Sequence, residues 1–173
     1  MTSNWPEYLN IPQSQLGEGL PVRVDVVADQ AAVARQMAEC MLAEIRSALE
    51  SRRRAVVIIP VGPVDQYPLL ARLINQERLS LQHVLLINMD EYLTDAGDWI
   101  DAAHPLSFRG YMQRAFYELI APELQPPVEQ RVFPDPRQLE AISRWIADWG
   151  GVDTCFGGIG INGHIAFNEP PEP

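Results

Sequence analysis

Apolar residues follow two different spacings along the chain. Residues 55–60 and 84–89 are almost uninterrupted hydrophobic runs, which is typical of strands buried on both faces of a parallel sheet. Residues 22–27 alternate valines with polar side chains and predict a further strand, nearer the sheet edge. Elsewhere hydrophobic positions recur every three or four residues and predict helices, at residues 30–52, 66–76, 106–120 and 139–149.

Strands that alternate with helices predict an α/β fold. We expect a three-layer, Rossmann-like arrangement in which helices flank a mainly parallel sheet. Residues 1–20 contain scattered prolines and glycines and predict an irregular N-terminal arm, whereas residues 21–173 predict a single α/β domain.

Composition and charge narrow the functional classes. The chain has 173 residues, of which 47% are hydrophobic and 21% charged, as in ordinary globular proteins. A net charge of -10 and a pI near 4.6 argue against a surface for nucleic acid or for an anionic membrane. All 13 basic residues are arginines, which excludes a lysine Schiff base and a Walker-type loop. We find neither a signal-peptide pattern nor an apolar run of about 18 residues, so we expect a cytoplasmic protein.

Cysteines and the basic run give no sign of a cofactor. Cys40 and Cys155 lack metal-like spacing, and we expect them to be buried thiols. Arg52, Arg53 and Arg54 close a predicted helix, where positive charge complements the helix dipole; a solvated helix end is favoured over a phosphate site. We therefore predict neither a metal nor an organic cofactor.

The segment 152–170 carries the most chemistry. A strand-like run ends in glycines that allow close backbone approach to a ligand, at Gly157, Gly158, Gly160 and Gly163. His164 and Glu169 follow, close enough for the carboxylate to orient the imidazole for proton transfer. A glycine-rich surface turn beside a structural histidine is the alternative. A dinucleotide-binding turn is disfavoured, because no helical pattern begins after Gly163.

A second candidate segment ends the strand predicted at residues 84–89. Asp90 and Glu91 follow it directly, and ligands of open parallel sheets bind beyond the carboxyl ends of the strands. His104, farther on, either reaches a ligand or fixes its own loop through a backbone contact, and the sequence does not decide between these roles.

Together these segments resemble the glucosamine-6-phosphate deaminase (isomerase) family. The resemblance runs from about Val22 to Pro170, and three stretches carry it: Asn88-Met-Asp-Glu-Tyr92, His104-Pro-x-Ser107 and Gly163-His-Ile-Ala-Phe-Asn-Glu-Pro170. The related 6-phosphogluconolactonases usually have Gly-His-Thr-Ala where this chain has Gly163-His-Ile-Ala166.

The resemblance implies an enzyme of amino-sugar catabolism that turns an amino-sugar phosphate into a ketose phosphate and ammonia. It implies that Asp90 is the base that moves a proton between adjacent carbons, that His164 assists ring opening, and that Glu169 orients His164. Further candidates for substrate binding are Gly62, Glu91, Gly158, Gly160, Asn162 and Gly163. For Glu91 a role in bracing the turn is favoured. The implied partner is a small-molecule sugar phosphate, and a homo-oligomer stays open.

Three departures from the family pattern qualify this prediction. Asn162 replaces the acid that precedes Gly-His, and an amide cannot stabilise an imidazolium by charge, so we expect weakened ring opening. The turn after residue 60 carries Pro63, which lacks an amide donor, and Asp65, which repels a phosphate. Family members also continue well past Asn-Glu-Pro, so we expect a domain truncated at its C-terminal end. The alternatives are a sugar-lactone hydrolase and a catalytically weak sugar-phosphate-binding or regulatory homologue.

Overall fold

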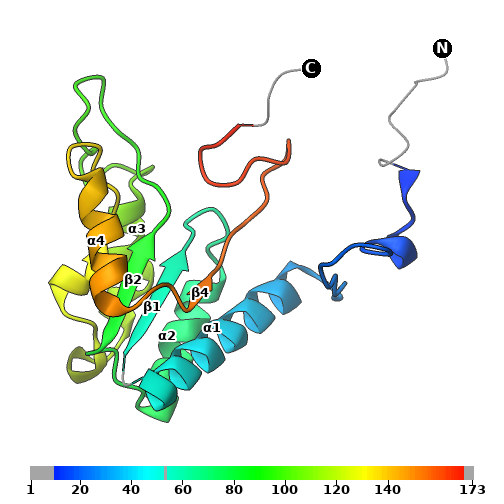
Figure 1. Ribbon diagram of the computed structural model, residues 1–173, viewed down its shortest axis with the longest axis horizontal. Helices are drawn as coiled ribbons and strands as arrows, with labels where there is room; N and C mark the ends of the chain where they lie inside the picture. The colour runs from blue at the N-terminus through cyan, green and yellow to red at the C-terminus, as the bar shows by residue number, and fades with distance from the viewer. Residues whose placement is uncertain (1–9, 53, 170–173) are drawn as a thin grey trace.

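The computed structural model describes residues 10–52 and 54–169. The first part of the expected arm, Arg53 of the basic run and Pro170 of the last motif lie outside the described residues. Within them, one four-stranded parallel sheet has the order β3-β2-β1-β4 (Figure 1). The central strands β1 (Ala55–Ile59) and β2 (Val84–Asn88) pair along their whole length, and the short strands β3 (Arg131–Val132) and β4 (Thr154–Cys155) lie at the edges. The predicted α/β fold is confirmed.

The helices cover the two faces of the sheet unequally. Helices α1 (Gln30–Arg52), α2 (Gln66–Glu77) and α3 (Phe108–Ala115) pack on one face, and α4 (Leu139–Trp149) packs on the other. The chain returns after α4 through Gly150, whose φ of 89° is the left-handed conformation that favours glycine at a helix end. The bounds predicted for three of the four helices are thus confirmed within a residue, and only the third differs substantially.

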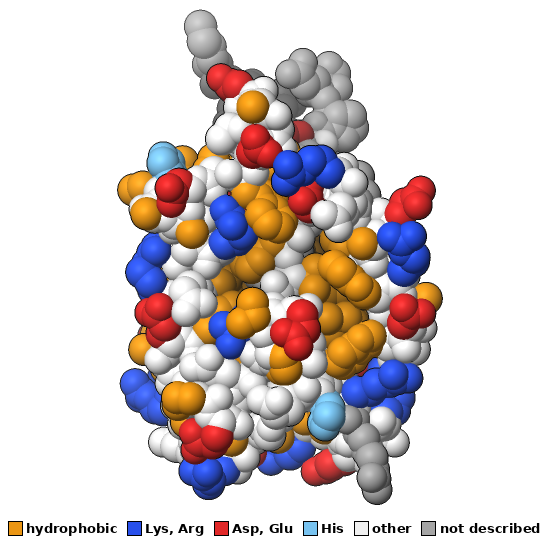
Figure 2. All heavy atoms as spheres, turned by 90° about the vertical axis from the view of Figure 1, so that its left-hand side faces the viewer, with side chains coloured by type: hydrophobic (Ala, Val, Ile, Leu, Met, Phe, Trp, Pro, Cys, Tyr) orange, Lys and Arg blue, Asp and Glu red, His pale blue; other side chains and the backbone are white. Residues whose placement is uncertain are grey.

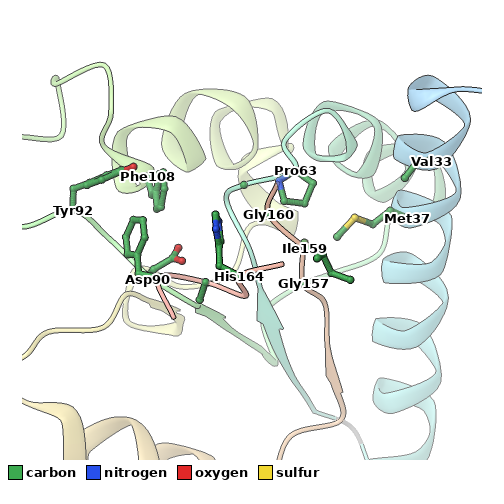
Figure 3. A pocket seen from close by; sticks show the side chains of 14 residues that line it. Val33, Met37, Pro63, Asp90, Tyr92, Phe108, Gly157, Ile159, Gly160 and His164 are labelled. Atoms are coloured by element: carbon green, nitrogen blue, oxygen red, sulfur yellow. The ribbon is translucent and has the colours of Figure 1, made fainter. Parts of the chain in front are cut away.

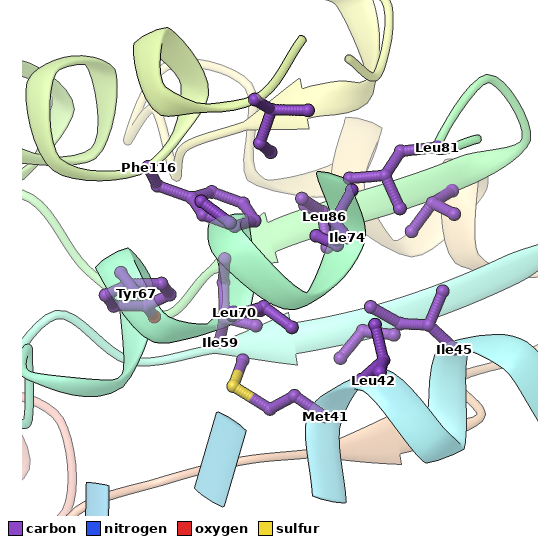
Figure 4. Close-up of a cluster of buried hydrophobic side chains, with 14 of the residues drawn as sticks. Met41, Leu42, Ile45, Ile59, Tyr67, Leu70, Ile74, Leu81, Leu86 and Phe116 are labelled. Atoms are coloured by element: carbon purple, nitrogen blue, oxygen red, sulfur yellow. The ribbon is translucent and has the colours of Figure 1, made fainter. Parts of the chain in front are cut away.

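The main core lies between the sheet and α1, α2 and α3 (Figure 4). Alternate residues of β1 and β2 face it, including Ile59 and Leu86, and meet Ile45 from α1 and Leu70 from α2. Each such side chain, when fully buried, contributes roughly 1.5–3 kcal/mol to folding. This layer holds the carboxyl ends of β1 and β2 in fixed positions, and the candidate catalytic groups follow those ends.

The opposite face of the sheet has a thinner cover. Ile142 and Ile146 of α4 pack on Val56, Leu85, Ile87 and Val132. Trp145, whose pattern predicts a core position, is 40% exposed instead, because α4 turns only one side toward the sheet. Figure 2 shows one side of the molecule, on which hydrophobic side chains gather around a hollow with basic and acidic side chains interspersed.

Three other expectations prove wrong in the structure. Residues 22–27 form no strand: their valines are exposed, and the segment extends away from the sheet (Figure 1). No strand of the described residues lies beside it to pair with. Cys40 and Cys155 are exposed rather than buried, since Cys40 lies on the outer side of α1 and Cys155 on an edge strand. The helix predicted at 106–120 is shorter, because α3 ends at Ala115 and a 3-10 turn follows at Tyr117–Leu119.

Among the described residues, none of the helices combines the length and the apolar character needed to cross a lipid bilayer.

Candidate active site

A cavity of about 520 Å³ opens at the carboxyl ends of the strands (Figure 3). Its walls come from the start of α1, the turn after β1, the residues after β2, the start of α3, and segment 157–167 after β4. Asp90 and His164 both line it, from segments more than 70 residues apart in the sequence. Their convergence follows from the topology, since β1 separates β2 from β4 and all three run in parallel.

Asp90 has the environment of a carboxyl group prepared to accept a proton. It follows the buried strand β2 directly, and its Oδ1 atom is buried with no hydrogen-bond partner among residues 10–52 and 54–169. Burial, with a smaller contribution from the negative charge of Glu91, raises the pKa of Asp90 above its ordinary value. A carboxylate with a raised pKa is a stronger base than an exposed aspartate and takes a proton more readily from a substrate carbon.

Glu91 holds the turn beneath Asp90 together. Its side chain is fully buried, and Oε1 accepts hydrogen bonds from the backbone N–H groups of Tyr92 at 2.9 Å and Phe108 at 3.0 Å. Oε2 accepts from the Ser107 hydroxyl at 3.1 Å and from Arg109, through its backbone N–H at 2.8 Å and its Nε at 3.3 Å. Glu91 does not line the cavity shared by Asp90 and His164, so its contacts are those of a brace.

The loop 94–104 is tied down by groups that do not reach the cavity. The Arg109 guanidinium lies 4.6 Å from the centre of the Trp99 ring, and Trp99 Nε1 donates to the Pro134 carbonyl at 2.7 Å. His104 Nδ1 accepts a hydrogen bond from the Leu106 backbone N–H at 3.2 Å. Of the two roles considered for His104, the structure shows the backbone contact within its loop.

His164 belongs to a cluster with Asn162 and Glu169. Its Nδ1 atom lies 2.5 Å from Asn162 Oδ1 and 3.5 Å from Glu169 Oε1. The Asn162 amide Nδ2 donates to Glu169 Oε2, which closes the triangle. Asn162 and Glu169 do not line the cavity, and both contact the imidazole at Nδ1. The cluster therefore engages Nδ1, and among the described residues Nε2 has no hydrogen-bond partner.

The glycines of this segment differ in what they permit. A Cβ atom on Gly160 would collide with the ring of His164, so the absence of a side chain there makes room for the imidazole. A Cβ on Gly158 would lie 2.8 Å from Pro63 Cδ, which indicates close packing of two turns. Gly163 has a φ of 87° and open space around it, so its requirement is conformational. Gly158 and Gly160 line the cavity, and Gly163 does not.

An aromatic wall stands beside Asp90, and the sequence patterns did not single it out. Tyr92, Phe108 and Phe167 come from three different segments, and their ring centroids lie 4.9 to 6.0 Å apart. All three line the cavity. Tyr92 and Phe167 do fall within the stretches that carry the family resemblance, which was the available signal. The Phe108 and Phe167 rings stack and Tyr92 packs at an angle to both, so the three rings hold the C-terminal segment against the start of α3.

The turn between β1 and α2 offers little to an anion. Gly62 and Pro63 line the cavity, and Val61 is buried. Asp65 precedes α2, and its carboxylate accepts a hydrogen bond from Gln30 Nε2 at 2.7 Å. A carboxylate thus stands at the helix start, where a phosphate would otherwise benefit from the helix dipole. None of the described residues lining the cavity is an arginine.

The basic run lies far from this site. Arg52 Nη2 pairs with Asp153 Oδ2 at 2.7 Å, and its Nη1 donates to the Gly150 carbonyl at 3.0 Å. Arg54 donates to the Asp148 carbonyl at 3.3 Å. These contacts join the ends of α1 and α4 at the amino edge of the sheet. In the part of the chain that the structure describes, no group of His, Cys, Asp and Glu side chains is arranged to hold a metal ion.

Comparison with known proteins connects this geometry to a family. The chain is 32% identical over 156 residues to a glucosamine-6-phosphate deaminase of Phocaeicola vulgatus, an alignment that covers 86% of this chain and 57% of the relative. It is 35% identical over 156 residues to a glucosamine-6-phosphate deaminase of Cellvibrio japonicus, covering 86% and 55%. This chain therefore spans little more than half the length of these relatives. A search of protein-family models gave no match.

Solved structures give the same relationship. A monomeric glucosamine-6-phosphate deaminase superposes with a TM-score of 0.66 at 26% identity, over 83% of this chain and 58% of that one. The 6-phosphogluconolactonase of Trypanosoma brucei has a TM-score of 0.60 at 16% identity, over 86% and 63%, and shares the fold alone. The resemblance that the sequence motifs indicated is thus confirmed.

Proposed function

Because this chain is a relative of the glucosamine-6-phosphate deaminases and matches a little over half of their length, we propose that it acts in their reaction. In that reaction a 2-amino-2-deoxyaldose phosphate, glucosamine 6-phosphate or an epimer, becomes a ketose phosphate and ammonia. One observation carries the proposal: Asp90 and His164 face a single cavity of about 520 Å³. Cavities of roughly 300–1,000 Å³ are usual for small-molecule ligands, so a hexose fits between the two groups.

Ring opening is the step assigned to His164. A pyranose opens when the C1 hydroxyl loses a proton and the ring oxygen gains one. An imidazole suits both transfers, because it exchanges protons near neutral pH. Asn162 and Glu169 occupy one ring nitrogen of His164, which leaves the other nitrogen for the sugar.

Isomerisation is the step assigned to Asp90. In the open-chain aldehyde the C2 proton is acidic, and its removal gives an enolamine in which C1 and C2 share a double bond. The same carboxyl group then returns the proton to C1, on the same face. The partly buried position and raised pKa of Asp90 favour this reversible transfer.

Release of ammonia is the last step of the reaction. Proton delivery to C1 leaves an iminium ion at C2, to which water adds before the C–N bond breaks. The products are a ketose phosphate and ammonia, and one water molecule is consumed. The backbone groups of Gly62 and Gly158, which line the cavity, are available to bind the sugar hydroxyls. The Gly160 N–H already donates to the His164 carbonyl, so Gly160, like Asn162 and Gly163, supports the histidine segment.

Ammonia production from glucosamine 6-phosphate tests the proposal. We expect the unaltered protein to release ammonia and fructose 6-phosphate in equal amounts, and expect Asp90→Asn to reduce kcat by at least about 100-fold, the usual contribution of a general base. Asp95→Asn is the matched control, since this exposed aspartate lies in the loop 94–104 and does not line the cavity.

The alternatives give different results in the same experiment. Hydrolysis of 6-phosphogluconolactone without ammonia release would favour the lactone hydrolase. Saturable binding of glucosamine 6-phosphate with neither activity would favour the regulatory homologue. Equal turnover by Asp90→Asn and the unaltered protein would remove Asp90 from the mechanism.

A further inference from the structure

The Asn162 side chain contacts both other members of its cluster, His164 and Glu169, through separate atoms. Oδ1 lies 2.5 Å from His164 Nδ1 and also accepts a hydrogen bond from the His164 backbone N–H at 3.3 Å. Nδ2 donates to Glu169 Oε2 on its other side. An amide oxygen can only accept hydrogen bonds, and an amide nitrogen can only donate them.

These neighbours determine the orientation of the amide. If the amide were turned over, its oxygen would face the Glu169 carboxylate, and two acceptors would be in contact. The His164 backbone N–H would then face an NH₂ group and lose its acceptor. Both contacts favour the orientation with Oδ1 toward the imidazole, so the negative charge of Glu169 fixes the position of the Asn162 oxygen.

The fixed oxygen determines which imidazole nitrogen carries the proton. Since Oδ1 accepts only, the neutral ring satisfies it with a proton on Nδ1. The lone pair then lies on Nε2, at the ring edge next to Gly160, which lines the cavity. We propose that Asn162 is a positioning residue that relays the orientation of Glu169 to His164 and holds the neutral imidazole in its Nδ1–H tautomer, with Nε2 as the proton acceptor in the cavity.

An amide and a carboxylate at position 162 would differ in their effect on the charge of His164. An acid here would also accept from Nδ1, but it would stand against the Glu169 carboxylate with no proton between them. The two negative charges would stabilise the imidazolium and keep Nε2 protonated to higher pH. With Asn162, the charged groups of the described residues that face this region are Glu169, 3.5 Å from Nδ1, and Asp90 on the cavity wall.

Nitrogen-15 NMR of the His164 ring tests the inference without any substrate. In the neutral form, the unaltered protein should show a protonated Nδ1 and an unprotonated Nε2. Asn162→Ala should lose this preference and give a mixture of tautomers. Asn162→Asp should keep the Nδ1–H form, because a carboxylate oxygen also accepts from Nδ1. Asn168→Ala is the matched control, because this asparagine bonds to the Ile165 carbonyl, and its variant should keep the original spectrum.

Several results would overturn the inference. A neutral His164 protonated on Nε2 in the unaltered protein would do so, as would an unchanged tautomer in Asn162→Ala. Comparison with Asn168→Ala separates a specific effect from general loosening of the segment, since both substitutions remove an exposed amide from it. The pH profile of kcat/KM for ammonia release is a second readout that rests on the proposed function. The NMR result does not depend on the proposed function. If the proposed activity fails, the spectra alone still test the tautomer assignment.

Discussion

Gly160→Ala isolates the placement of the His164 ring better than any substitution of the histidine itself. Gly160 has no positive φ, so alanine imposes no backbone strain there, and the only new feature is a Cβ atom. That atom would collide with the imidazole, at the edge that carries Nε2. The ring or the turn must then move by about 1 Å, and a misplacement of that size costs on the order of 100-fold in rate. This corresponds to about 2.7 kcal/mol of lost transition-state stabilisation.

Ammonia release and thermal unfolding measure this effect together. We expect kcat/KM of Gly160→Ala to fall by roughly 100-fold, while its stability changes by less than about 1 kcal/mol, since glycine-to-alanine changes without strain are small. Gly157→Ala is the control, because a Cβ there meets only Met89 Cε, at an ordinary 3.5 Å. Equal activity of Gly160→Ala and Gly157→Ala would show that the His164 ring does not act from its position in the structure.

Four further predictions concern the groups in and around the cavity. The pKa of Asp90 is raised in the folded state, so its contribution to stability is present at low pH and is lost as the pH rises through that pKa. Asp90→Asn should therefore have a higher free energy of unfolding than the unaltered protein at neutral pH, measured by urea unfolding. The variant should nevertheless be inactive. For the unaltered enzyme, kcat/KM should rise with pH through a midpoint above the ordinary aspartate range, and a midpoint at or below that range would contradict the assignment of the base. Glu91→Gln should lower the free energy of unfolding by about 2–3 kcal/mol, because an NH₂ group would face buried donors, and no loss would show that the brace is dispensable. Asp65→Ser should tighten inhibition by inorganic phosphate by roughly 2–5-fold, since it removes a carboxylate from the start of α2; unchanged inhibition would place the phosphate elsewhere.

The sequence was sufficient for the framework that positions the site. Strands β1 and β2 are apolar throughout, and the long helices have continuous three- and four-residue spacing, so local pattern and tertiary burial agree. Asp90 and His164 could be expected together because each follows a strand of one parallel sheet. Such a prediction needs only the direction of the strands.

Features that depend on packing between distant segments could not be predicted. The alternation in residues 22–27 has the period of a strand, but a strand also requires a neighbour with free backbone groups, and the pattern does not supply one. Exposure of Cys155 depends on how far α4 covers the sheet. The contact of the Asn162 amide with both His164 and Glu169 depends on the fold of one irregular segment, in which side-chain directions follow no simple period.

Hydrogen transfer during the reaction tests the central claim most directly. If Asp90 moves one proton from C2 to C1, glucosamine 6-phosphate carrying deuterium at C2 should give fructose 6-phosphate with part of that deuterium at C1, on a single face. Proton NMR of the product formed in ordinary water would measure it, alongside the ammonia released. A ketose with deuterium or solvent hydrogen distributed over both faces of C1, or one formed at an undiminished rate by Asp90→Asn, would contradict the account.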